Sequence, residues 1–112
     1  MSSPVLDPEV WGALQAAMGP DMVPRLVAQL RDDLDASAER LQAAAGRGDL
    51  DAVRAEAHAM AGMAGSVGAA ELSLAVERLR SAAVAGDRDT LQLQVSAVCQ
   101  AIKRLLSTLN SV

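Results

Sequence analysis

His58 is the only histidine of the chain, and the residues around it on a predicted helix are unusually small. At helical spacing, Ala61, Gly62 and Gly65 lie beside it along one stripe. A glycine inside a helix costs about 1 kcal/mol relative to alanine. A stripe that accepts this cost leaves room for a bulky group to approach the imidazole closely. Because a neutral imidazole nitrogen is nucleophilic near neutral pH, this pattern favours phosphoryl transfer.

Two other interpretations of His58 compete with this one. A lone histidine on a helix is, without further context, most often a structural residue, but that role leaves Gly62 and Gly65 unexplained. Helical bundles also bind haem through histidine and methionine, and Met60 and Met63 lie close by in the sequence. The chain has no Cys-x-x-Cys-His motif, and a haem site needs the imidazole turned into the bundle. We therefore interpret Met60 as a core residue.

The composition indicates an all-α protein. Hydrophobic residues make up 51% of the 112 residues, yet Trp11 is the only aromatic residue and most of the others are good helix formers. The net charge of −4 and the lack of a Lys/Arg cluster argue against a nucleic-acid partner. Cys99 is the single cysteine, which excludes a disulfide framework and favours a cytoplasmic setting. We interpret Cys99 as a small core residue. Neither a signal peptide nor an apolar run of about 18 residues is present, so we expect no membrane association.

Capping residues and helix breakers predict five helices. The first begins at Pro8, with Asp7 as its N-cap, and ends before Gly19. The second is capped by Asp21 and runs to about Ala45.

The remaining three helices have similar boundaries. Asp49 caps the third, Gly68 separates it from the fourth, which stops near Gly86, and Asp87 starts the last. Apolar residues recur at intervals of three and four on the long helices, as expected for faces that turn inward. These residues are Val23, Leu26, Val27, Leu30, Leu34 and Leu41 on the second helix, Leu50, Val53, Ala57, Met60 and Ala64 on the third, Leu72, Ala75, Val76, Leu79 and Ala83 on the fourth, and Leu91, Val95, Val98, Ile102, Leu105 and Leu109 on the last.

Short connections between long amphipathic helices favour antiparallel neighbours. We expect an all-α fold in which residues 1–112 form one domain, an up-down antiparallel four-helix bundle with a short N-terminal capping helix. Pairing the second and third helices about residue 47 places a partner surface level with His58, formed by Asp33, Ala36, Ser37 and Arg40. The acidic residues of the second helix are spread around it and are interpreted as a solvated face, not a metal site; they are Asp32, Asp33, Asp35 and Glu39.

The spacing around His58 resembles the motif of histidine-containing phosphotransfer domains. That motif consists of His-x-x-Lys-Gly, five variable residues, Gly-Ala and a later Leu, and here His58 to Gly62 is followed by Gly68-Ala69 and Leu72. The segment Leu6-Asp-Pro-Glu-Val10 and the Gly-Asp pairs at 48–49 and 86–87 also fall where that family has them. The resemblance therefore covers essentially the full length.

The resemblance implies a phosphoryl carrier without kinase activity of its own. Such domains accept a phosphoryl group from an aspartyl phosphate on a receiver domain and pass it to another receiver. It implies that His58 is the phosphoryl acceptor, that Gly62 and Gly65 leave room for the partner, and that Mg²⁺ is bound by the receiver, so that this chain needs no cofactor or metal. The implied partners are response-regulator receiver domains, with a hybrid histidine kinase as a further candidate, and the chain is expected to be a monomer.

One position departs from the motif, because Ala61 stands where the family has lysine. A cation near the phosphoryl group stabilises its charge. Arg54, one turn before His58 on the same stripe, is one candidate to supply it, and Arg80, which antiparallel pairing about Gly68 brings roughly level with His58, is another. The alternative is a non-catalytic receiver-binding or scaffold module that keeps the fold and the docking face.

Overall fold

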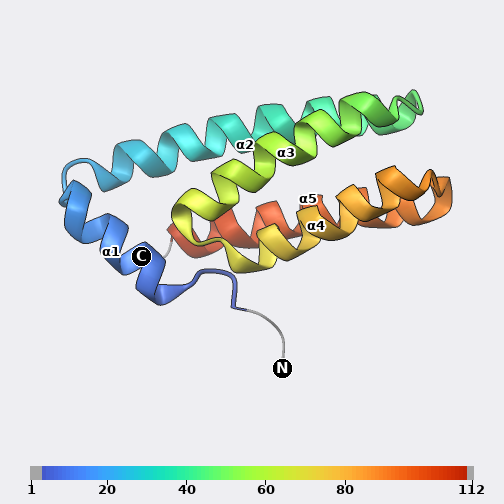
Figure 1. Ribbon diagram of the computed structural model, residues 1–112. Coiled ribbons are helices and arrows are strands. Elements are labelled where there is room, and N and C mark those ends of the chain that lie inside the picture. The colour runs from blue at the N-terminus through green and yellow to red at the C-terminus, as the bar shows by residue number, and fades with distance from the viewer. Residues whose placement is uncertain (1–3, 111–112) are drawn as a thin grey trace.

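Five α-helices make up the computed structural model, which describes residues 4–110. They are α1 (Pro8–Met18), α2 (Val23–Gly46), α3 (Leu50–Val67), α4 (Ala70–Ala85) and α5 (Arg88–Asn110), and the described range contains no strand. The long helices form a closed ring, because α3 packs against α2 and α4, and α5 packs against α4 and α2. Figure 1 shows each of these four helices running opposite to the one before it, with α1 lying across one end and contacting α3.

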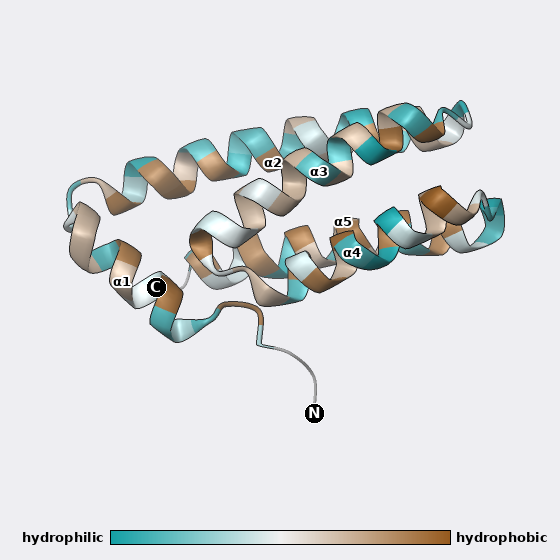
Figure 2. Cartoon of the chain, viewed as in Figure 1, coloured by the Kyte–Doolittle hydropathy of each residue, from teal (hydrophilic) through white to brown (hydrophobic). Residues whose placement is uncertain are grey.

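The apolar stripes predicted from the sequence form most of the core. Every predicted inward position of α4 and α5 is buried, and in α3 the same holds for all but Leu50, which is half-buried. The first turns of α2 differ, because Val23, Leu26 and Val27 are only half-buried where α2 extends past the end of α3 (Figure 1). Figure 2 shows hydrophilic and hydrophobic residues alternating along the long helices, as expected for helices with one face in a core.

Aspartate side chains cap three of the helices, and two of these caps, Asp7 and Asp49, were predicted as caps, whereas Asp87 was predicted only as the start of the last helix. Asp7 Oδ1 accepts from the Glu9 N–H at 2.9 Å, Asp49 Oδ1 from Ala52 at 3.1 Å, and Asp87 Oδ1 from Thr90 at 3.2 Å. Each bond satisfies an N–H group that has no partner within its helix.

The predicted cap at Asp21 is wrong. α2 begins at Val23 with Met22 as its N-cap, and among the described residues no side chain caps it. The Gly19 carbonyl oxygen instead accepts from the N–H groups of Met22 and Val23, both at 3.3 Å, while Pro24 has no N–H to satisfy. Backbone groups of the preceding turn thus replace the side-chain cap.

Gly68 joins α3 to α4 and also holds the N-terminal segment in place. Its φ of +72° is left-handed, and its carbonyl oxygen accepts from the Asp7 N–H at 2.7 Å. A Cβ atom added to Gly68 would lie 2.6 Å from the Cβ of Val10. Glycine at this position is therefore required by the fold, since it lets α1 pack closely on the α3–α4 turn.

Cys99 lies at the edge of the core and not within it. The side chain is half-buried, and its Sγ accepts from Nε2 of Gln42 at 3.5 Å. Burial raises the pKa of the Cys99 thiol, and the opposing effects of Lys103 and Gln42 are smaller. A raised pKa makes this thiol less reactive than an exposed one.

Within residues 4–110, none of the helices is both long enough and apolar enough to span a bilayer.

Candidate functional site

His58 lies in the middle of α3 with its side chain exposed. Within residues 4–110, no side chain or backbone group hydrogen-bonds or ion-pairs with its imidazole. A structural histidine normally has such a partner, because its ring nitrogens are polar. Met60, two residues further on, is fully buried, so the two side chains lie on different sides of α3 and do not form one haem site. The ring is left free to react with an incoming group.

The surface next to His58 is cleared of side chains by two glycines. Gly62 and Gly65 are exposed, and a Cβ atom added at either position would meet no described atom within 4 Å. The contrast with Gly68 is informative, because packing inside the chain requires glycine there but not at the other two positions. Two open glycines beside His58 therefore leave room for a group from outside the chain to approach the imidazole closely.

A polar bridge between α2 and α3 lies beside this surface. Ser37 is fully buried, and its hydroxyl donates to Glu56 Oε2 at 2.7 Å. Arg40 Nε donates to Glu56 Oε1 at 2.5 Å. Glu56 is two residues before His58, so the bridge fixes the rotation of α3 relative to α2 close to the imidazole.

The charge of Glu56 is stabilised by this bridge. Partial burial of the carboxyl opposes ionisation, but hydrogen bonds from Arg40 and Ser37 and the positive charge of Arg40 outweigh it, and together they lower the pKa of Glu56. The same interactions hold the Arg40 guanidinium at the edge of the α2–α3 interface.

The bridge corrects the sequence-based prediction for Ser37. It also adds Glu56, a residue that we did not predict, to the site. Ser37 does not lie on an exposed partner surface, because it is fully buried and its hydroxyl donates to the half-buried Glu56 between α2 and α3. The sequence holds a signal for this burial, since Ser37 completes a 4-3-4 spacing with the buried residues Leu30, Leu34 and Leu41. Of the other predicted surface residues, Asp33 and Arg40 are exposed and Ala36 is half-buried.

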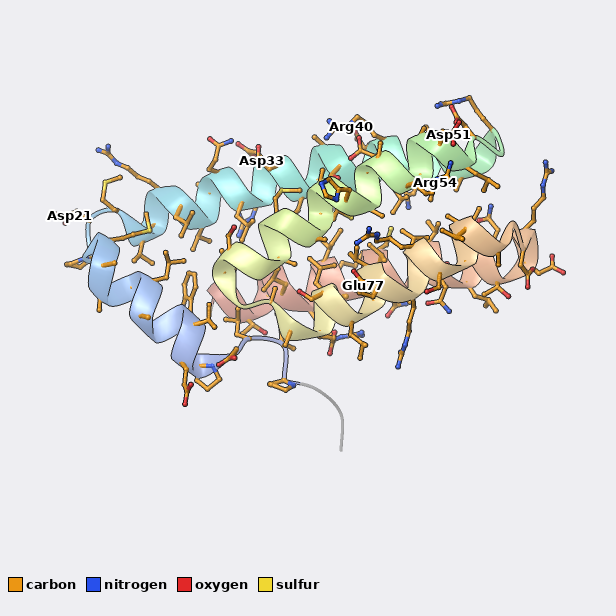
Figure 3. All side chains as sticks on the ribbon, in the orientation of Figure 1. Asp21, Asp33, Arg40, Asp51, Arg54 and Glu77 are labelled. Carbon is orange, nitrogen blue, oxygen red and sulfur yellow. The ribbon has the colours of Figure 1, made fainter. Side chains whose placement is uncertain are left out.

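The two arginines predicted to assist His58 each pair with an acidic residue on their own helix. Arg54 Nη2 donates to Asp51 Oδ1, and Figure 3 labels both residues near the start of α3. Arg80 Nη1 donates to Glu77 Oε1 at 3.1 Å on α4. Within the described part of the chain neither arginine hydrogen-bonds to His58, and a direct role for either stays a prediction.

The acidic residues of α2 form a solvated face as predicted. All four side chains are exposed; they are those of Asp32, Asp33, Asp35 and Glu39. Throughout residues 4–110, no group of three or more His, Cys, Asp or Glu residues is arranged to hold a metal ion.

The imidazole of His58 is exposed and has no partner within residues 4–110, and it lies on a helical bundle beside two glycines that packing does not require. This arrangement suits a carrier of a covalently bound group. Residues 25–111 match the family described as Hpt domain, and the chain belongs to this family. Membership supports a role in histidine phosphotransfer within two-component signalling.

Solved structures show the same fold over nearly the whole chain. Histidine-containing phosphotransfer protein B (HptB) from Pseudomonas aeruginosa PAO1 is 25% identical with a TM-score of 0.90, and the alignment covers 98% of this chain and 95% of that one. The maize protein ZmHP2 is 24% identical with a TM-score of 0.87, covering 96% and 81% of the two chains. A putative histidine-containing phosphotransfer protein from rice is 22% identical with a TM-score of 0.87, covering 95% and 79%. No curated protein sequence matches the chain.

Proposed function

We propose that this chain is a histidine phosphotransfer protein of a two-component phosphorelay. His58 accepts a phosphoryl group from the aspartyl phosphate of one receiver domain and passes it to another receiver. The antiparallel four-helix bundle, closed at one end by α1, serves to hold this imidazole on an open surface. The proposal rests mainly on His58, which is exposed, has no partner among the described residues and lies beside Gly62 and Gly65 in an Hpt domain.

The chemistry needs one nucleophile from this chain. A neutral ring nitrogen of His58 attacks phosphorus, the bond from phosphorus to the aspartate oxygen breaks, and the aspartate leaves as a carboxylate. The other ring nitrogen can hydrogen-bond to a neighbouring group during transfer. The return step reverses these bond changes on a second receiver, and the receiver is expected to bring the Mg²⁺ that neutralises the phosphoryl oxygens.

Arg54 and Arg80 are proposed to replace the missing lysine at position 61. Their pairs with Asp51 and Glu77 lie on the surface, where ion pairs contribute little and are easily exchanged. Substitution of both arginines by alanine, singly and together, should slow transfer to and from a receiver. Unchanged rates in the double variant would remove both residues from the mechanism.

The proposed receiver-docking surface consists of the exposed α3 residues around His58 and the adjoining α2 residues Asp33, Ala36 and Arg40. The expected setting is the cytoplasm, with the chain acting as a monomer. A hybrid histidine kinase is a further proposed partner.

A phosphoryl exchange assay tests this function. One receiver from the same genome is phosphorylated and purified, and a second receiver is added with or without the chain. We expect phosphoryl transfer to the second receiver only with the wild-type chain and not with the His58→Gln variant. Equal transfer by His58→Gln would refute the proposal.

The non-catalytic docking module is a second candidate, favoured by Ala61 and by the carboxylate partners of Arg54 and Arg80. It predicts receiver binding that is insensitive to His58→Gln and that leads to no exchange.

A further inference from the structure

Arg54 stands between two groups that a guanidinium can bind. Asp51 lies three residues before it on α3 and His58 four residues after it. Side chains at these spacings are neighbours on a helix surface. In the structure Arg54 donates to Asp51, and Figure 3 shows the two labelled side chains on adjacent turns of α3.

We propose that Asp51 competes with the phosphoryl group on His58 for Arg54, and so limits how strongly the chain holds that group. The inference rests on the proposed function and assigns a role to a residue with no part in the reaction itself. Asp51 is a positioning residue for Arg54, because it acts only through that guanidinium.

The exposure of the pair makes the competition possible. The Asp51 side chain is 86% exposed and that of Arg54 is 49% exposed, so solvent screens their attraction. A phosphoryl group offers up to two negative charges and three acceptor oxygens, which suit the fork of donors on a guanidinium. Phosphorylation of His58 should therefore draw Arg54 partly away from Asp51.

The choice of Arg54 follows from the distribution of cations. Arg54 is the only lysine or arginine within α3, and position 61 holds alanine. On the neighbouring helices Arg40 is held by Glu56 and Arg80 by Glu77. Arg54 is thus the cation that the helix of His58 itself supplies, and its carboxylate partner is the most exposed of the three.

Phosphoramidate loads His58 without any receiver. The phosphorus–nitrogen bond of phosphoramidate breaks, ammonia leaves, and a new phosphorus–nitrogen bond forms to the imidazole. The proton affinity of the attached phosphoryl group is then measured by phosphorus NMR as a function of pH. A guanidinium in contact favours the doubly charged form and lowers this affinity.

In the Asp51→Asn variant we expect the proton affinity of the phosphoryl group on His58 to be about twofold below that of wild type. This is the size of effect expected when one exposed ion pair on a helix is gained or lost. Arg54→Ala should raise the affinity. In the Arg54→Ala background Asp51→Asn should have almost no effect, because position 51 lies two turns from His58 and salt screens charges beyond about 8–10 Å. Arg40, Glu56, Glu77 and Arg80 are unchanged in all variants.

Asp89→Asn is a matched control, since Asp89 is the exposed second residue of α5 as Asp51 is of α3. An Asp51→Asn effect that equals the Asp89→Asn effect, or that persists without Arg54, would overturn the inference. Failure of phosphoramidate to load His58 would overturn it as well. If the proton affinities are as expected but the chain exchanges no phosphoryl group between receivers, the proposed function is refuted and the inference about Asp51 is not.

Discussion

Replacing Gly62 tests whether glycine at this position serves the fold or the partner. The added Cβ of alanine meets no described atom within 4 Å, and the backbone at Gly62 is helical. Alanine should therefore raise the free energy of unfolding by about 1 kcal/mol, the difference between the two residues inside a helix. For a chain of 112 residues this corresponds to a rise in Tm of about 4 °C. Gly65→Ala should add a similar amount.

A side chain larger than alanine at position 62 should slow phosphotransfer, whereas alanine raises stability. In Gly62→Leu the side chain lies one turn from His58 and obstructs the approach of a receiver, while its Cβ atom meets no described atom within 4 Å. We expect a transfer rate lower by up to about a hundredfold, as for a misplacement of about 1 Å between reacting groups. Stopped-flow or quenched transfer from a phosphorylated receiver measures this rate.

Gly12 provides the matched control for both effects. It is exposed, lies within α1 and also has no described atom within 4 Å of an added Cβ. Gly12→Ala should stabilise the chain like Gly62→Ala, and Gly12→Leu should leave transfer unchanged. Destabilisation by Gly62→Ala, or wild-type transfer in Gly62→Leu, would refute the reasoning.

Three further predictions concern the fold and the acceptor site. Gly68→Ala should destabilise the chain by about 1–3 kcal/mol in urea unfolding, because its φ is +72° and the new Cβ would lie 2.6 Å from Val10; no loss of stability would contradict the packing of α1. The lowered pKa of Glu56 means that its contribution to stability is full above the ordinary value of about 4.5 and is lost as the pH falls through the lower folded-state value. As the pH falls through this acidic range, Glu56→Gln should lose less stability than wild type. An equal loss in the two proteins would show that the Glu56 carboxyl is not the source of the acid-induced loss. Ala61→Lys should speed phosphoryl transfer from a receiver to His58 by about tenfold. The effect is smaller than that of a buried oxyanion-hole donor, because His58 is exposed to solvent. An unchanged rate would show that no cation is needed at position 61.

Local signals in the sequence predicted much of the fold. The caps at Asp7 and Asp49 follow from the residue type and its position before a periodic segment, and both bonds form. Asp87 was predicted as the start of the last helix, and its side chain also forms a cap. The inward stripes follow from spacing alone, since each long helix has one wide apolar face. Asp21 misled this reasoning, because a backbone turn at Gly19 satisfies the same donors.

The site was less predictable, because its polar contacts join residues far apart in the sequence. The bond from Ser37 to Glu56 spans 19 positions, and its existence depends on how α2 and α3 rotate against each other. Arg54 shows a different limit. Helical spacing gives it two possible partners, Asp51 and His58, and only the side-chain conformation decides which one it contacts.

Mass spectrometry of the intact chain after incubation with a phosphorylated receiver shows whether His58 itself carries the phosphoryl group. We expect a mass gain of one phosphoryl group in wild type, which is lost on brief acid treatment and is absent from His58→Gln. A gain of the same size in His58→Gln, or receiver binding without any gain across a panel of phosphorylated receivers, would contradict it.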